Sequence, residues 1–204
     1  IDINACGPEI GKAEIEQLFE KLKKLKSGDC LVLAGSIPKT LPDNIYEEIL
    51  GKLKDRGIDF VVDATGDLLK NVLKYKPFLI KPNHHELGEI FSVEIKTVED
   101  IKKYGKMLQE MGAKNVLVSR GKDGAALLDE KGNLHTMGNI PGKIVSSVGC
   151  GDSMVAGFLA GYCKTKDYSY ALRLGSACGN ATAFTSNLAT TSEINKALNN
   201  SELK

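Results

Sequence analysis

Hydrophobic positions recur along the first part of the chain in two alternating patterns. In residues 14–26 and 43–56 they return every three or four positions, the spacing of a helix with one buried face. A short apolar run follows each of these segments, over residues 29–34 and 58–62, and such runs are typical of buried strands. The pattern therefore predicts helices and strands in alternation.

The same alternation continues as far as residue 119. We expect a short helix at residues 67–73, a strand at 78–81, helices at 85–91 and 98–111, and a strand at 115–119. Alternating elements form a parallel sheet that is covered on both faces and binds ligands beyond the carboxyl ends of its strands. The functional site should lie at that edge of the sheet.

The pattern changes after residue 124. Apolar runs at residues 125–128 and 134–137 flank a polar segment, which predicts a β-hairpin. Three helices should complete the chain, at residues 153–162, 168–184 and 191–203. The first of them is apolar or small on nearly every side, so we expect it to be buried.

The composition fits one ordinary globular domain over residues 1–204, with 42% hydrophobic and 26% charged residues. The 27 basic and 26 acidic residues form no stripe of one sign, which argues against nucleic acid as a partner. No apolar run approaches the roughly 20 residues that span a bilayer. We expect a cytoplasmic protein without a membrane partner.

Cysteine and histidine spacings argue against a disulfide framework or a zinc site. The chain has no CxxC pair and no HxxxH pair. Reduced thiols are expected, and any metal should be held by oxygen atoms. The cysteines are Cys6, Cys30, Cys150, Cys163 and Cys178.

Glycine or polar residues follow every strand expected at the parallel edge. Taken singly, most of these segments are ordinary turns. Because they converge on one edge of the sheet, together they predict a cleft that handles phosphate. The segments are residues 35–36, 63–66, 81–83, 119–121 and 147–152.

The last segment is the most informative, because Gly149, Cys150 and Gly151 precede a helix whose first turn holds Asp152. Such a turn exposes backbone amides to an anion at the positive end of the helix dipole. Asp152 has two interpretations, a helix cap or a general base for an acceptor hydroxyl. We favour the base, beside amides that stabilise the transferring phosphoryl group.

Two familiar nucleotide signatures are absent. The chain has no GxxxxGK[ST] motif, and Met154 replaces the third glycine of GxGxxG, which weakens a dinucleotide-binding interpretation. Asn83 and Glu86, three residues apart at a strand-to-helix corner, could hold a hydrated Mg²⁺ through its waters. Helix capping is the alternative for this pair.

Residues 147–158, SVGCGDSMVAGF, resemble the C-terminal signature of the phosphofructokinase B family, the ribokinase-like carbohydrate kinases. The resemblance covers nearly the whole chain and implies a three-layer α/β/α fold with a mainly parallel sheet. It implies that Asp152 is the catalytic base. Cys150 departs from the family, where alanine is usual, and its thiol is an oxidation liability beside the phosphates.

Residues 80–87 resemble the N-x-x-E segment of the same family. The resemblance implies that Asn83 and Glu86 organise Mg²⁺ and that Lys81 approaches the phosphates of ATP. Further positions that match the nucleotide site of the family are Ser119, Gly121 and Gly124, with Ser176 and Asn180 near the base or ribose.

Residues 4–10, residues 35–38 and the doubled histidine at 84–85 resemble 1-phosphofructokinases and tagatose-6-phosphate kinases. The implied reaction moves the γ-phosphoryl group of MgATP to the C6 hydroxyl of fructose 1-phosphate. Tagatose-6-phosphate kinase is the alternative. The resemblance is compatible with a homodimer of the full-length enzyme.

The opening portion of the family, with its first strands, its lid and most sugar contacts, has no counterpart in this sequence. We therefore expect the 204-residue chain to bind nucleotide weakly and to turn over little or no sugar phosphate. Two competing hypotheses are a nucleotide-binding fragment without catalysis and a dinucleotide-dependent oxidoreductase.

Overall fold

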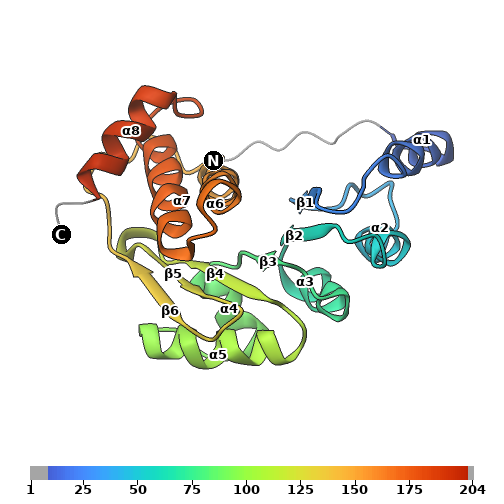
Figure 1. The fold of residues 1–204 in the computed structure, drawn as a ribbon, viewed down its shortest axis with the longest axis horizontal. Coiled ribbons are helices and arrows are strands. Elements are labelled where there is room, and N and C mark those ends of the chain that lie inside the picture. Colours follow the sequence, from blue (N-terminus) through green and yellow to red (C-terminus); the bar gives the residue numbers. More distant parts are fainter. Residues whose placement is uncertain (1–8, 202–204) are drawn as a thin grey trace.

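The computed structural model describes residues 9–201, which form one mixed sheet of six strands between layers of helices (Figure 1). The strands lie in sequence order, with β1 to β4 parallel and β5 and β6 added antiparallel as a hairpin. Their bounds are β1 Cys30–Ala34, β2 Asp59–Asp63, β3 Leu79–Ile80, β4 Asn115–Ser119, β5 Ala125–Leu128 and β6 Leu134–Met137.

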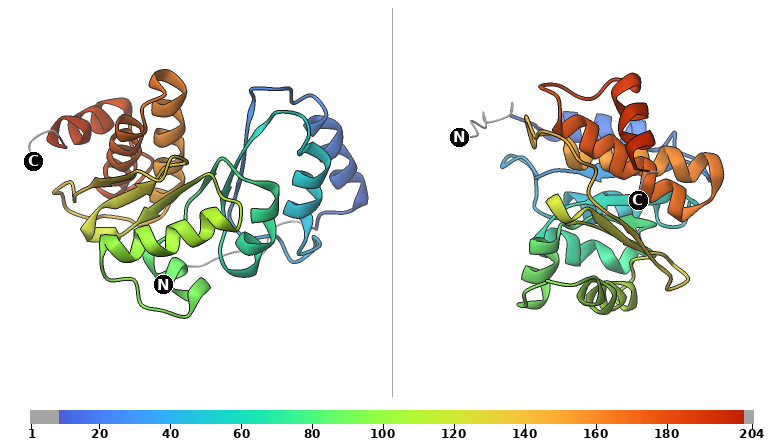
Figure 2. Two further views of the ribbon diagram at one scale, coloured as in Figure 1. Left: turned by 60° about the horizontal axis from the view of Figure 1, so that its bottom comes forward. Right: turned by 90° about the vertical axis from the view of Figure 1, so that its left-hand side faces the viewer.

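Helices cover the two faces of the sheet unequally (Figures 1 and 2). The first face packs against α1 Lys12–Leu22, α2 Ile45–Leu53, α3 Gly66–Val72, α4 His84–Phe91 and α5 Val98–Glu110. The second face packs against α6 Cys150–Thr165 and α7 Tyr168–Ala183, and α8 Thr191–Asn200 packs on α7. Single 3₁₀ turns occur at Leu73–Tyr75 and Gly121–Asp123. The expected three-layer α/β fold with a mainly parallel sheet is confirmed.

The strand sequences explain why both faces can be covered. Successive side chains of a strand point to opposite faces, so a strand that is buried on both sides must be apolar throughout. Val62 and Val118 belong to the core under α1 to α5, whereas their neighbours Val61 and Leu117 belong to the core under α6 and α7. The continuous apolar runs in the sequence therefore correspond to strands shared by two cores.

The expectation that residues 29–34 form a buried strand is wrong for one face. β1 is the edge strand, and Val32 is 43% exposed, with Cys30 and Ala34 also exposed. Leu33, on the other face, is buried among residues of α1 and α2. An edge strand lacks a neighbour on one side, and here it also lacks a covering helix on one face.

Helix α6 differs in the same way from the expected buried helix. Its small residues allow close packing on α7, since a Cβ at Gly157 would lie only 2.6 Å from the Sγ of Cys178. Ala156 and Ala160, however, are exposed. The residues are small along α6 because α7 approaches closely on one side, and the opposite side is open.

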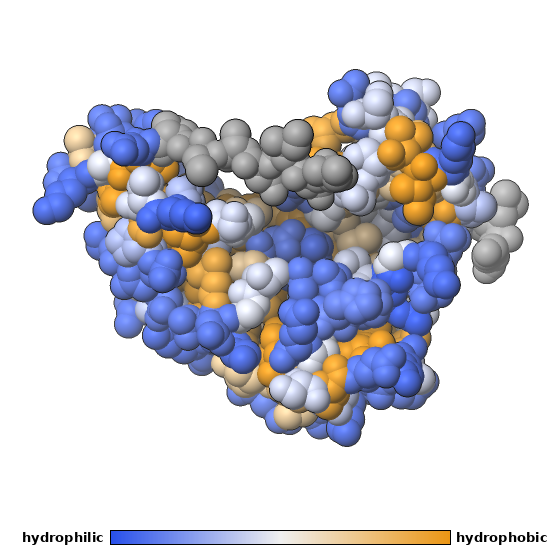
Figure 3. Space-filling model, turned by 180° about the vertical axis from the view of Figure 1, so that it is seen from behind, coloured by the Kyte–Doolittle hydropathy of each residue, from blue (hydrophilic) through white to orange (hydrophobic). Residues whose placement is uncertain are grey.

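The expected boundaries agree with the structure to within a few residues, and those of β4 and the hairpin coincide. Residues 1–8 and 202–204 lie outside the described part of the chain. Cys6, most of the motif at residues 4–10 and the end of the expected last helix fall there. Within residues 9–201, no helix is long and apolar enough to cross a membrane. The face seen in Figure 3 is largely hydrophilic, with separate hydrophobic areas.

Candidate active site

The turn from residue 149 to residue 152 leaves backbone amides free at the start of α6. Gly149 has φ 76° and ψ −1°, a left-handed conformation that favours glycine. Its carbonyl accepts the first helical hydrogen bond, from the Ser153 N–H at 2.9 Å. Among the described residues, the N–H groups of Gly151 and Asp152 have no hydrogen-bond acceptor. They form, with the helix dipole, a site suited to an anion, which we call the anion loop (residues 149–152).

The Asp152 side chain does not cap this helix. The N-cap residue is Gly149, and the Asp152 carboxylate accepts no hydrogen bond from any described residue. The side chain is exposed in the first turn of α6. The geometry thus leaves this carboxylate available for a proton, in line with the interpretation as a general base.

Lys81 reaches the anion loop from the end of β3. Its Nζ lies 3.2 Å from Oδ1 of Asp63, which ends the neighbouring strand β2. A Cβ at Gly151 would lie 3.3 Å from the same Nζ, so the glycine leaves room for the ammonium group beside the loop. Lys81 is 7% exposed. The lysine predicted to approach phosphate therefore lies where the free amides are.

Asp63 belongs to this site, although its sequence context did not identify it as a site residue. Burial raises the pKa of its carboxyl group above the ordinary value, and the negative charges of Asp152 and Glu86 act in the same direction. The Lys81 ammonium group opposes both effects. The sequence did hold a signal for this residue, because Asp63 ends β2 and Lys81 follows the adjacent parallel strand β3. The expected strand order alone did not show that the two side chains form an ion pair.

Asn83 and Glu86 form a capping box at the start of α4. The Asn83 Oδ1 accepts from the N–H groups of His85 and Glu86 at 2.9 Å, and Glu86 Oε2 accepts from the Asn83 N–H at 2.8 Å. The structure therefore shows the helix capping that was the alternative role for Asn83 and Glu86. No group of three or more metal-ligating side chains is found among residues 9–201.

The same pair still fits a hydrated Mg²⁺ held through water. Glu86 Oε1 has no hydrogen-bond partner among the described residues. The charges of Glu86, Asp63 and Asp152 are close enough to influence one another. Carboxylate oxygens of this kind suit a Mg²⁺ that keeps most of its water ligands.

A cavity of about 260 Å³ lies beside the anion loop, and we call it the glycine cavity. It brings together most residues that were predicted to contact nucleotide, from the 3₁₀ turn after β4, the start of α6 and the end of α7. Its lining residues include Ser119, Gly121, Gly124, Ile140, Gly142, Cys150, Gly151, Asn180 and Phe184.

Ser176 is not brought into the glycine cavity. It is 1% exposed, and its hydroxyl has no hydrogen-bond partner in the described structure. Its carbonyl accepts from the Asn180 Nδ2 at 2.9 Å, so it positions the neighbouring amide instead. Lys81, Asn83 and Glu86 also lie outside this lining, at the corner between β3 and α4.

A larger cavity, of about 690 Å³, lies on the other side of the anion loop, and we call it the carboxylate cavity. Gly151 lines both cavities. The carboxylate cavity contains no lysine or arginine in its described lining. Its lining residues are Gly35, Ser36, Ile37, Asp43, Asp63, Ala64, Thr65, Asp67, Leu68, Asn71, Gly151 and Asp152.

The thiol of Cys150 is partly buried in the anion loop. Burial raises the pKa of its thiol, and the Sγ donates a weak hydrogen bond to the Ser146 carbonyl at 3.5 Å. Because the thiolate is the reactive form, a raised pKa slows oxidation at neutral pH. We therefore expect slower oxidation of Cys150 than its position beside the phosphates suggests.

The fold and the anion loop between two cavities define a ribokinase-like α/β protein. The chain belongs to the family of pfkB carbohydrate kinases, whose sequence pattern matches residues 1–195. It is similar to 1-phosphofructokinase of Bacillus subtilis, with 46% identity over 190 residues, 93% of this chain and 62% of the relative. It is also similar to D-tagatose-1-phosphate kinase of Bacillus licheniformis, with 35% identity over 93% of this chain and 62% of the relative.

Solved structures give the same fold. A Staphylococcus aureus structure described as a phosphofructokinase superposes with a TM-score of 0.91 and 39% identity, over 97% of this chain and 64% of that one. The chain thus spans less than two thirds of the length of the relatives and the structure named here.

Proposed function

We propose that this chain carries the ATP-binding and catalytic part of a sugar-phosphate kinase. The observation that carries the proposal is the position of Gly151, on the wall shared by two cavities and beside Lys81. ATP in the glycine cavity would place its γ-phosphate at the free amides of the anion loop. An acceptor in the carboxylate cavity would then meet that phosphate from the opposite side.

The residues of the loop supply the parts that phosphoryl transfer needs. Asp152 takes the proton of the acceptor hydroxyl, and the amides of Gly151 and Asp152 stabilise the charge on the transferring group. Lys81 turns from Asp63 to the phosphate oxygens. Mg²⁺, held through water by Glu86 with Asn83, would neutralise phosphate charge when bound. Positioning and electrostatics account for most of the catalysis in such reactions, so a weak base suffices.

The carboxylate cavity suits the hydroxyl end of a sugar. Asp43, Asp63, Asp67 and Asp152 can accept hydrogen bonds from hydroxyl groups, whereas they repel a phosphate. We infer that the free C6 end of fructose 1-phosphate enters this cavity and that its 1-phosphate is bound by cations outside it. Tagatose 1-phosphate, which differs in configuration at C4, presents the same C6 hydroxyl. The names of the relatives favour these two acceptors over tagatose 6-phosphate, the alternative predicted from the sequence.

The lack of cations in the carboxylate cavity also supports the prediction of weak activity for the 204-residue chain. Sugar-phosphate affinity should be low because nothing in this lining pairs with the phosphate. Single-turnover conditions, with protein in excess over labelled ATP, are therefore the suitable assay. Fast multiple turnover by the purified chain would contradict this part of the proposal.

The test measures MgATP and NAD binding by calorimetry and phosphoryl transfer to fructose 1-phosphate and tagatose 1-phosphate. Asp152→Asn should preserve MgATP affinity and lower the transfer rate by about 10²-fold or more, the usual scale for a general base. Asp55→Asn, an exposed carboxylate change at the end of α2, is the control. Binding of NAD without ATP would instead support the oxidoreductase hypothesis.

A further inference from the structure

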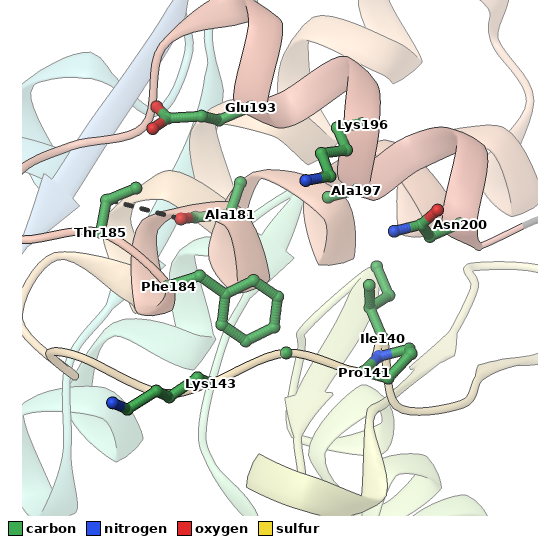
Figure 4. Close-up of a pocket in the computed structure, with 11 residues that line it drawn as sticks. Ile140, Pro141, Lys143, Ala181, Phe184, Thr185, Glu193, Lys196, Ala197 and Asn200 are labelled. Atoms are coloured by element: carbon green, nitrogen blue, oxygen red, sulfur yellow. Dashed lines mark hydrogen bonds between the residues drawn. The ribbon is translucent and has the colours of Figure 1, made fainter.

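A third cavity, of about 350 Å³, lies between residues 140–143, the end of α7 and α8 (Figure 4). We call it the α8 cavity. Its floor is apolar, with Ile140, Ala181 and Ala197 buried in one core cluster, and the ring of Phe184 forms a wall. No residue of the anion loop lines it. The cavity is therefore separate from the proposed phosphoryl-transfer site.

The polar groups around the α8 cavity favour an anion. Lys196 and Asn200 extend from α8 toward the interior of the cavity, and Lys143 lies at its rim (Figure 4). Within the described part of the chain, neither lysine forms an ion pair. Glu193 also lines the cavity, but its Oε2 accepts hydrogen bonds from the N–H and Oγ1 of Thr190, both at 2.7 Å. One oxygen of that carboxylate is thus engaged in capping α8, and the lining keeps two lysines against one acidic side chain.

We propose that the α8 cavity binds an amphipathic organic anion, with a flat apolar body and one carboxylate or sulfonate group. The apolar body would pack on Phe184 and the buried floor, and the anion would lie between Lys196 and Asn200. The volume falls in the range of small-molecule sites, which are mostly apolar with a few placed polar groups. Two lysines against one carboxylate leave the lining with a net positive charge beside an apolar floor, which is the charge pattern that such a ligand complements.

The α8 cavity shares a wall with the glycine cavity. Ile140, Gly142 and Phe184 line both. A Cβ at Gly142 would lie 2.2 Å from the Phe184 ring, so the segment and the ring are in tight contact. A ligand that presses on Phe184 must therefore change the glycine cavity. The bound anion acts as an effector of nucleotide binding, and this coupling rests on the proposed nucleotide site, whereas the anion site itself does not.

The first experiment is a fluorescence titration of the 204-residue chain with 8-anilinonaphthalene-1-sulfonate, an aromatic sulfonate. Lys196→Glu should weaken binding about fivefold or more, because an attraction becomes a repulsion. Asn200→Trp should block the cavity and abolish the same binding phase. Lys102→Glu, on the exposed side of α5, is the matched charge-reversal control and should bind as the parent does.

The second experiment repeats the titration with saturating MgATP. The probe should still bind, with an affinity altered by about twofold or more, and the probe should alter MgATP affinity by the same factor. Complete displacement by MgATP, or equal binding by all variants, overturns the proposal. Unfolded variants would be recognised by circular dichroism, and Lys196→Gln then replaces Lys196→Glu. Loss of the proposed function has a different signature, namely no MgATP binding while the Lys196-dependent probe site persists.

Discussion

The Nζ of Lys81 lies 3.2 Å from Oδ1 of Asp63, and both side chains are largely withdrawn from solvent, with 8% and 17% of their surface exposed. The ion pair stands directly against Gly151, where a phosphate would bind. A nucleotide phosphate must therefore compete with Asp63 for the same ammonium group. This competition allows the roles of the two residues to be separated.

Lys81→Met should lower MgATP affinity by about tenfold or more and destabilise the fold by about 3 kcal/mol, because it leaves a buried carboxylate unpaired. Asp63→Asn should keep or raise MgATP affinity, since it releases Lys81 from its partner. Calorimetry and urea unfolding measure the two effects. The double variant should recover part of the stability lost in Lys81→Met. Equal losses of affinity in both single variants would show that the pair acts as one unit.

Gly149→Ala should destabilise the protein and weaken MgATP binding. A left-handed conformation costs a non-glycine residue about 1–2 kcal/mol, and the new Cβ would lie 2.9 Å from Leu188 Cδ2. Gly132→Ala is the matched control, because Gly132 has φ 83° but no atom within 4 Å of the added Cβ. Urea unfolding should show a lower free energy of unfolding for both variants, because each places alanine in a left-handed conformation. Calorimetry should show weaker MgATP binding for Gly149→Ala alone. Unchanged MgATP affinity in Gly149→Ala would show that the anion loop does not contribute to ATP binding.

Much of this fold could be predicted because the hydrophobic periods were unambiguous. The β-hairpin at residues 125–137 and strand β4 coincide with their apolar runs, and the Thr97 capping box starts α5 where the periodic pattern begins. The anion loop was predictable for a local reason, since its two glycines, separated only by Cys150, and the start of a helix are neighbours in sequence. The exposure of the amides in this loop depends little on residues that are distant in the sequence.

Other features of the structure depend on contacts between segments that are far apart in the sequence. The periodicity of hydrophobic residues does not predict such contacts. The exposure of Val32 follows from the edge position of β1, and the Asp63 ion pair follows from the register of β2 and β3. Whether Ser176 lines a cavity depends on the rotation of α7 against α6, and the structure turns it into the core. These features required three-dimensional packing rather than local preference.

Asp129 should contribute stability that disappears in acid. It is 2% exposed; burial alone would raise its pKa, but hydrogen bonds from His135, from Asn133 and from the Lys131 N–H prevail, and the pKa is lowered from its ordinary value of 3.8. A carboxyl whose folded-state pKa is lowered stabilises the protein above the unfolded-state value. That contribution is lost as the pH falls through the lowered folded-state pKa.

Asp129→Asn should therefore cost about 1–3 kcal/mol at pH 7, because buried donors lose their acceptor, and the cost should shrink as the pH falls toward 3. Urea unfolding of parent and variant over pH 3–7 measures this difference. Asp123→Asn, in the exposed 3₁₀ turn, should show no such convergence. A difference that stays constant over the whole pH range would contradict the assignment of the stabilising form to the carboxylate.

The described cysteines should differ strongly in their rate of alkylation. Burial of the thiol, with the neighbouring charges of Asp59 and Cys163, raises the pKa of Cys30 to about 11. At pH 8 only about one Cys30 thiol in a thousand is then ionised. Burial also raises the pKa of Cys150 and of Cys178. Cys163, on the open side of α6, is exposed.

Iodoacetamide at pH 8 should accordingly modify Cys163 first, as peptide mass spectrometry of a Cys6→Ser background would show. Raising the pH from 8 to 10 should accelerate the alkylation of Cys30, because its pKa of about 11 leaves nearly all of this thiol protonated at pH 8. Urea should bring the four rates together by removing the burial that separates them. If Cys150 reacted as fast as Cys163 in the folded protein, its thiol would carry the thiolate character that burial beside the anion loop is expected to suppress.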